Sequence, residues 1–249
     1  MAGHSKFKNI MHRKGAQDRL RAKLFSRLGK EISIAVKIGG SEVDSNIRLK
    51  SAIAAAKNAN MPKDNIVRAI HRGTENTPDS NFEEVRYEGY GPFGTAIIVE
   101  ALTNNKNRTA SEIRTIFSKN GGNLGESGSV SYNFKKYGNI LIDKKIANEE
   151  NFFNYAVEIG SVEIETNEKN YSVFCQVQDY HQIIEKISKK FGKPILTQIV
   201  WKCDSSIEVE KNNTESLFKL INELEDNDDV QNVSSNFIIK HESINKINY

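Results

Sequence analysis

The chain has 249 residues, of which 38% are hydrophobic and 27% are charged, and its formal net charge is +3. This length and composition are typical of a folded chain with more than one domain, and no apolar run approaches the ~20 residues that a membrane-spanning helix needs. Two cysteines, Cys175 and Cys203, are too few for a disulfide scaffold or for a zinc site. We therefore expect neither a disulfide-rich secreted protein, nor a membrane protein, nor a metal centre.

The charge is distributed unevenly along the chain. Residues 1–77 carry 16 Lys and Arg against 6 Asp and Glu, whereas residues 78–249 carry 19 against 26. A basic end of this kind is typical of a chain that binds a polyanion. The alternative is that the basic and acidic parts of the chain attract each other. No apolar stretch follows the basic N-terminus, so we expect no secretory signal and a cytoplasmic protein.

A basic amphipathic helix is predicted over residues 18–38. Apolar side chains recur there at steps of three and four, and Gly39 and Gly40 are expected to end the helix. Cations cluster on nearly the opposite side, which is either a solvated helix face or a face that binds phosphate. The cations of this helix and those that precede it are the predicted nucleic-acid contacts: Lys6, Lys8, Arg13, Lys14, Arg19, Lys23, Arg27 and Lys30.

Two shorter helices are expected to complete a helical N-terminal domain. The first covers residues 45–59, with Asp44 or Ser45 as its N-cap. The next begins at Pro62, a residue that suits the first helical turn, and ends at Gly73. The N-terminal part therefore reads as a basic arm followed by a small three-helix unit.

The character of the sequence changes after residues 74–81, a polar and turn-rich stretch that predicts a domain boundary. Alternating apolar residues then indicate strands, and a longer periodic segment indicates a helix. The expected elements are strands at 83–91 and 94–102, a helix at 107–122 capped near Thr109, and a strand at 128–134.

Residues 135–203 show the order β-α-β-β-α-β, which is a complete split βαβ unit. The strand–strand–helix–strand segment before it lacks a second helix and a last strand, and both are found after it, at 214–226 and 230–239. We therefore expect an α+β protein in which one ferredoxin-like domain is inserted into another. The predicted domains are a basic three-helix domain at 1–78, an α+β domain at 79–134 and 204–249, and an inserted α+β domain at 135–203.

Six ordered motifs resemble one known family. They are MAGHSKFKNIMHRK at the N-terminus, PKDNIVRAI at 62–70, YEGYGPFGTAIIVEALTNN at 87–105, NRTASEIR at 107–114, GGNLGESGSV at 121–130 and DDVQNVSSNF at 228–237. On these motifs the chain is similar to the YebC/PmpR family, which includes the mitochondrial translational activators of cytochrome oxidase subunit I. Phe7 and Asn104 stand where the family usually has Trp and Asp, and residues 135–203 match least well.

The resemblance implies a three-domain fold and one of two functions. Members are generally described as DNA-binding transcriptional regulators, and others resemble translation factors that act at the ribosome. We expect a DNA-binding transcriptional regulator of the YebC type, with a ribosome-associated translation factor that binds RNA as the alternative. A small-molecule sensor is a third interpretation, which rests on fold analogy alone.

Two further places in the sequence are predicted to dock a partner or RNA. Lys106 and Arg108 stand at a helix start, where cations oppose the helix dipole, and such a conflict is typical of an anion or partner site. Glu126 and Ser127 are expected at the exposed tip of a glycine-rich turn. A nucleotide cradle there is the weaker interpretation, because no Lys-Ser or Lys-Thr pair follows and a strand comes next.

No recognisable catalytic constellation appears in the sequence. It contains no nucleophile–base pair, metal-ligand set or cofactor fingerprint. We therefore expect a protein that is not an enzyme and that has no cofactor, no metal and no small-molecule substrate. Its expected partners are DNA or RNA, including the ribosome, rather than a membrane, and a monomer is expected.

Overall fold

The computed structural model describes residues 14–75 and 82–239, with side chains from Arg21 onward except those of 211–213. It mixes helices with small sheets, which confirms the predicted α+β class. Contacts divide the chain into two compact units: residues 131–206 form the second unit, and the chain on both sides of them forms the first. The finer division of the first unit into two domains stays a prediction. Across the described ranges, no helix is both long and apolar enough to cross a membrane.

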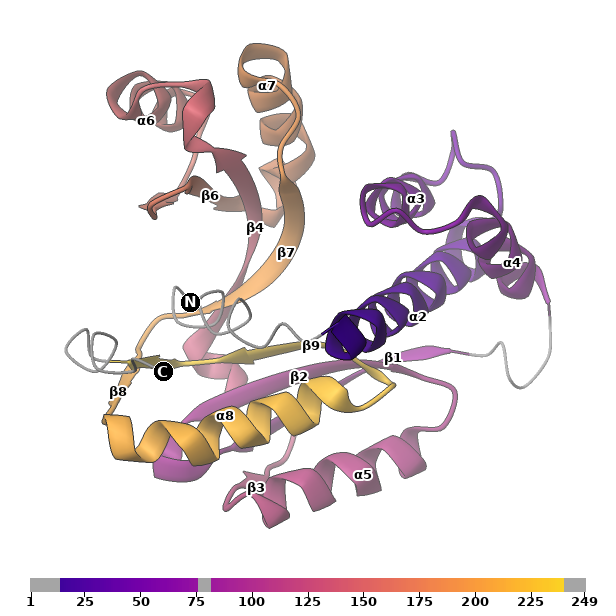
Figure 1. Cartoon of the computed structure of the whole chain (residues 1–249), viewed down its shortest axis with the longest axis vertical. Coiled ribbons are helices and arrows are strands. Elements are labelled where there is room, and N and C mark those ends of the chain that lie inside the picture. The colour runs from indigo at the N-terminus through magenta and orange to yellow at the C-terminus, as the bar shows by residue number, and fades with distance from the viewer. Residues whose placement is uncertain (1–13, 76–81, 240–249) are drawn as a thin grey trace. The chain divides into compact units, whose positions relative to one another are not determined.

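Three helices form the N-terminal part of the first unit (Figure 1). They are α2 (Lys14–Gly39), α3 (Ile47–Asn58) and α4 (Lys63–Thr74). Their apolar faces meet in a core that includes Ile32, Val36, Leu49 and Ile66, all buried. Burying these faces is what stabilises helices as short as α3 and α4, since isolated helices of that length are marginal in water.

Two predicted helix boundaries are wrong for a tertiary reason. Asn46, not Asp44 or Ser45, caps α3: its side chain accepts a hydrogen bond from the Leu49 amide at 3.0 Å. Gly73 does not stop α4, which continues to Thr74. A Cβ at Gly73 would lie only 2.5 Å from the Ser33 carbonyl oxygen on α2, so close helix packing explains this glycine.

The rest of the first unit is an α+β part. Its antiparallel sheet has the order β3-β1-β2-β9, and β8 and β10 form a separate parallel pair. Its elements are β1 (Glu83–Tyr90), β2 (Ala96–Thr103), α5 (Lys106–Lys119), β3 (Asn123–Leu124), β8 (Ile207–Val209), α8 (Lys211–Asp226), β9 (Val230–Ser235) and β10 (Phe237–Ile239). Helices α5 and α8 lie side by side against one face of the sheet (Figure 1), where Ile97, Val99, Phe117 and Leu220 are buried.

The predicted strand at 128–134 is wrong, as is the predicted cap at Thr109. Gly128 has a φ of 91°, and the Val130 amide donates to the Glu88 carboxylate at 3.0 Å instead of to a neighbouring strand. The chain then makes a short 3₁₀ turn, and β4 begins at Phe134.

The cap of α5 is Asn105, whereas Thr109 is a buried residue within the helix.

The second unit has the predicted order of elements. It consists of β4 (Phe134–Asp143), α6 (Glu149–Glu158), β5 (Glu163–Thr166), β6 (Asn170–Gln176), α7 (Tyr180–Phe191) and β7 (Leu196–Cys203). The sheet has the order β5-β6-β4-β7, entirely antiparallel, and α6 and α7 cover one face (Figure 1). Ile140, Phe152, Val173 and Ile183 are buried between helices and sheet. This is the ferredoxin-like arrangement.

Candidate nucleic-acid interface

Three cations on α2 contact an acidic turn between α8 and β9 in the same unit; we call residues 225–229 the acidic turn. Lys23 Nζ lies 3.0 Å from the Asp226 carboxylate. The Arg27 guanidinium donates to the Glu225 carbonyl oxygen at 2.6 Å. Burial lowers the pKa of Arg27, and the carboxylates of Glu225 and Asp226 partly oppose this effect. Within the described residues, Arg27 Nε has no hydrogen-bond partner.

Asp229 is the most connected residue of the acidic turn. Its carboxylate accepts hydrogen bonds from Lys30 at 2.8 Å, from Arg108 at 2.6 Å and from the Thr109 hydroxyl at 2.7 Å. Burial by itself would raise the pKa of Asp229, but these hydrogen bonds outweigh it and hold the pKa well below its usual value. Asp229 is therefore a buried anion that ties α2, α5 and β9 together.

The structure brings together only part of the predicted basic site. Lys6, Lys8 and Arg13 lie outside the described residues, and Lys14 and Arg19 lie in the first turns of α2. Lys23, Arg27 and Lys30 contact the acidic turn, which is the attraction between basic and acidic parts that the sequence left open. Binding of nucleic acid by these eight residues stays a prediction, and for the last three a phosphate would have to compete with existing contacts.

The predicted docking residues fall in two separate places. Lys106 Nζ lies 2.5 Å from the Glu83 carboxylate, and Arg108 is held by Asp229, so both cations already have an acidic partner. Glu126 and Ser127 are exposed, in the loop that follows β3. A docking role for any of the four stays a prediction.

A groove between α2 and α4 contains functional candidates that the sequence reasoning missed. Its volume is about 430 Å³. The lining residues are Ala22, Phe25, Ser26, Gly29 and Lys30 from α2, Met61 from the connection before α4, and Asn65, Arg68, Ala69 and Arg72 from α4. The available signal was the polar face of α4, where Asn65, Arg68 and Arg72 follow one another at steps of three and four.

The two arginines of the groove are exposed and differ in their contacts. Arg68 donates to the Asn65 side-chain oxygen at 2.5 Å and to the Asp64 carbonyl oxygen at 3.4 Å. The Arg72 guanidinium has no hydrogen-bond or ion-pair partner within residues 14–75 and 82–239. A planar guanidinium that is free to donate is suited to a bidentate contact with phosphate.

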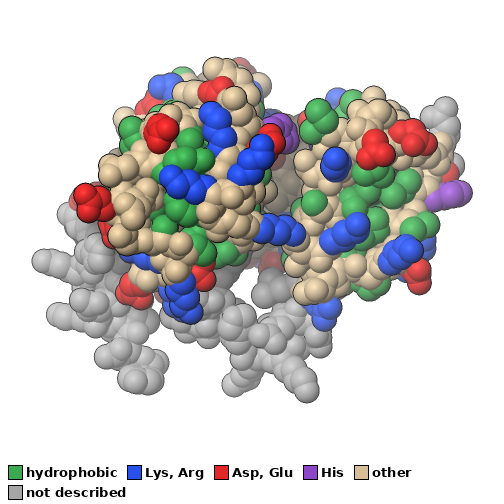
Figure 2. Space-filling model, turned by 90° about the horizontal axis from the view of Figure 1, so that it is seen from above, with side chains coloured by type: hydrophobic (Ala, Val, Ile, Leu, Met, Phe, Trp, Pro, Cys, Tyr) green, Lys and Arg blue, Asp and Glu red, His purple; other side chains and the backbone are tan. Residues whose placement is uncertain are grey.

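The outer surface of the helical part has a different character. Figure 2 shows it as the right-hand part of the view, where Lys and Arg side chains stand apart from one another among apolar and uncharged ones. Lys50 and Lys57 of α3 are exposed. No dense cationic patch is visible on this face of the described residues, so the groove arginines are the more concentrated cationic feature.

The described residues give no indication of a metal or a reactive thiol. No group of three or more His, Cys, Asp or Glu within them could hold a metal ion. Burial raises the pKa of the Cys175 thiol to about 11, and the charge of Asp179 acts in the same direction. This thiol is therefore protonated and unreactive near neutral pH.

Comparison with known proteins places the chain in one family over nearly its whole length. Residues 5–76 match the family model of the TACO1/YebC protein N-terminal domain, and residues 82–237 match that of the TACO1/YebC second and third domain. The fold is similar to the crystal structure of a conserved hypothetical protein, Aq1575 from Aquifex aeolicus. The two share 40% sequence identity with a TM-score of 0.84, over 93% of this chain and 96% of that one. The two family models together cover most of the chain, and the chain therefore belongs to the TACO1/YebC family.

Proposed function

We propose that this chain is a non-enzymatic, cytoplasmic regulator of gene expression that binds nucleic acid through its basic N-terminal part, as a DNA-binding transcriptional regulator. The observation that carries the proposal is the charge of residues 1–77, 16 Lys and Arg against 6 Asp and Glu, in the part of the chain that matches the family's N-terminal domain. The family model that matches residues 82–237 also carries a transcriptional-regulator label, which supports the regulatory class.

The proposed contacts fall into two groups. Lys23, Arg27 and Lys30 contact the acidic turn, so they add to binding only if a nucleic acid displaces that turn. The side chains of the other five lie outside the described part of the chain: Lys6, Lys8, Arg13, Lys14 and Arg19.

The salt dependence of binding tests the proposal and separates these two groups. Each phosphate contact on duplex DNA changes the log–log salt slope by about −0.9, so five contacts predict a slope of about −4 to −5 and eight a slope of about −7. Binding of a labelled duplex would be measured by fluorescence anisotropy over a series of KCl concentrations. Binding that is indifferent to KCl, or that survives deletion of the N-terminal part, would contradict the proposal.

The translation alternative is supported by the kind of residues in the basic part. Lys and Arg contact phosphates without reading bases, so this part suits the shape and charge of an RNA as well as those of a promoter. Cross-linking in cells followed by sequencing of the attached DNA and RNA distinguishes the two. Recovery of promoter DNA supports transcription, whereas recovery of ribosomal RNA, with co-sedimentation on ribosomes, supports translation.

A further inference from the structure

We propose that the groove between α2 and α4 binds single-stranded nucleic acid, with one unstacked base on its apolar floor and the adjoining phosphate on its arginines. This inference rests on the proposed function, because it names a surface and a class of ligand through which that function would act. The groove and the basic side of α2 share Lys30, which lines the groove and contacts the acidic turn, whereas Lys23 and Arg27 of that side do not line the groove.

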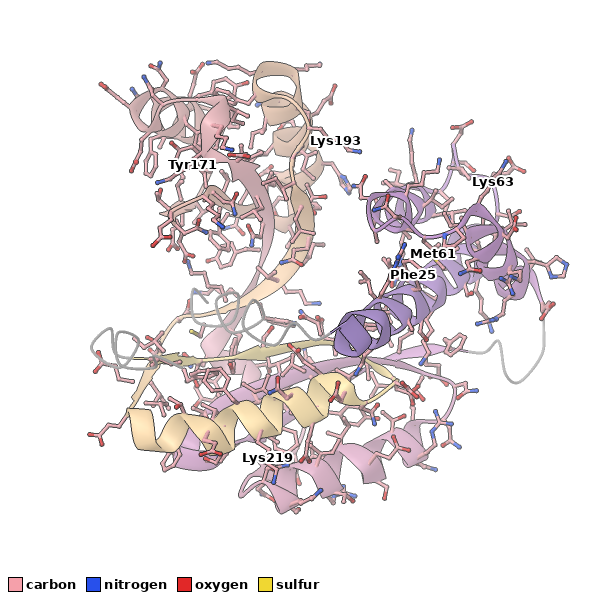
Figure 3. The ribbon with its side chains drawn as sticks, viewed as in Figure 1. Phe25, Met61, Lys63, Tyr171, Lys193 and Lys219 are labelled. Carbon is pink, nitrogen blue, oxygen red and sulfur yellow. The ribbon has the colours of Figure 1, made fainter. Side chains whose placement is uncertain are left out.

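The floor of the groove can receive a planar group. Phe25 is partly exposed and lines the groove together with Met61, and Figure 3 shows the two labelled residues near each other beside α2. The guanidinium carbon of Arg21, which does not line the groove, lies 5.3 Å from the centre of the Phe25 ring. Unpaired bases stack on aromatic rings, so Phe25 offers a base a suitable surface.

The side of the groove formed by α4 can receive a phosphate. Arg68 and Arg72 stand one helical turn apart and line the groove together. The hydrogen bond from Arg68 to Asn65 fixes the direction of one guanidinium, and Arg72 has no side-chain partner within the described ranges. No carboxylate is among the lining residues, so the charge of the groove is complementary to an anion.

The size of the groove favours a single strand over a duplex. A volume of about 430 Å³ falls in the range of sites that hold one small molecule, such as a nucleotide. In a duplex the faces of the bases are covered by stacking, so a duplex could contact the arginines but not the floor. A single strand can use both.

The first test compares two double variants of the full chain that lose the same charge. Arg68→Ala with Arg72→Ala removes the phosphate contacts, and Lys50→Ala with Lys57→Ala removes two exposed cations of α3 that have no partner within the described residues. Anisotropy would be measured with a short labelled RNA strand, the DNA strand of the same sequence, and the corresponding DNA duplex. We expect about tenfold weaker binding of the single strands for the arginine variant and less than about threefold for the lysine control.

The second test removes the aromatic surface of the floor without changing charge. Phe25→Leu keeps an apolar side chain in the groove but leaves no ring on which a base can stack. We expect about tenfold weaker binding of single strands, as for the loss of one stacked base, with an unchanged salt slope and unchanged duplex binding. Thermal unfolding checks that the variant folds. Should it fail to fold, Phe25→Met tests the same floor with a more flexible apolar side chain.

The outcomes separate the groove from the proposed function. If the wild type binds one of the two single strands more tightly than the other, and the groove variants lose that affinity, the groove is supported. The strand that binds more tightly, RNA or DNA, is then the one that the groove takes. If the wild type binds nucleic acid and the groove variants bind it equally well, the groove proposal is overturned. The same holds if affinity falls equally in the lysine control. In both cases the proposed function still stands. Absence of wild-type binding to every probe overturns both.

Discussion

At the scale of single residues, Asp229 makes the stability of the first unit depend on pH. Its side chain is only 7% exposed, and it accepts hydrogen bonds from Lys30, Arg108 and Thr109. Asp229→Asn leaves the two cations facing a neutral amide. Because removing one partner of a buried ion pair is costly, we expect a loss of roughly 3 kcal/mol in the free energy of unfolding at pH 7.

The sign of the pH effect follows from the lowered pKa of Asp229. In the unfolded chain the Asp229 carboxylate binds a proton near pH 3.9, about the usual value, whereas in the folded chain it does so only at lower pH. The carboxylate therefore stabilises the fold fully above about pH 3.9, and this stabilisation is lost as the pH falls below it. The difference in the free energy of unfolding between wild type and Asp229→Asn should therefore shrink by about 1 kcal/mol as the pH is lowered from 5 to 3. Urea unfolding over this range measures it, and a constant difference would contradict the assignment.

A matched control is available in the same turn. Asp226 pairs with Lys23, but its side chain is 77% exposed. An exposed ion pair contributes little, so Asp226→Asn should change the free energy of unfolding by no more than about 1 kcal/mol. A similar loss in both variants would mean that burial of Asp229 is not what matters.

At the scale of elements, the cap of α3 shows what local sequence can and cannot predict. Asp44, Ser45 and Asn46 are all favourable N-cap residues, so the sequence places the helix start to within a few residues but cannot choose among them. The choice depends on tertiary contacts: the Asn46 amide also donates to the carbonyl oxygens of Ala35 and Gly40, both at 2.8 Å.

This difference predicts unequal effects of two neighbouring substitutions. Asn46→Ala removes the cap and two hydrogen bonds from a buried side chain, and should cost about 2 to 3 kcal/mol. Ser45→Ala removes one hydrogen bond at an exposed site and should cost less than about 0.5 kcal/mol. Chemical denaturation of both variants measures the two costs, and equal losses would mean that Asn46 has no special role.

The candidate site was predictable to a similar extent. Periodicity identified α2 and its basic side, because that pattern is local. The partner of that side, the acidic turn, lies some 200 residues further along the chain, and only the tertiary fold brings Lys23, Arg27 and Lys30 to it. The groove was missed for the same reason, since Phe25 and Arg72 become neighbours only when α2 packs on α4.

At the scale of the whole molecule, the second unit is the part whose element order the sequence predicted best. Its strands are short apolar-rich runs and its helices show helical periodicity, so local pattern is enough to predict the order of elements. The register between its strands depends on pairing across the sheet, for example Ile140 opposite Val173 and Thr197, which no single segment reveals.

The second unit should fold without the rest of the chain. It has its own core, and its two ends meet: the Asp204 amide donates to the Asn133 carbonyl oxygen at 2.8 Å, and the Asn133 side chain bonds the Ser205 backbone. A fragment of residues 131–206 should therefore show a cooperative urea transition and dispersed amide resonances. A disordered fragment would mean that its core depends on the first unit.

The same fragment tests where the affinity for polyanions lies. Residues 131–206 contain ten Lys and ten Asp and Glu, so this unit is neutral, and the cationic excess of the chain lies in its first 77 residues. Because binding to a polyanion follows local cationic density, the fragment should not be retained on heparin at low salt, whereas the full chain should be retained and then released by KCl. Retention of the fragment on heparin would mean that the second unit binds polyanions. It would contradict the nucleic-acid binding that is proposed for the helical part.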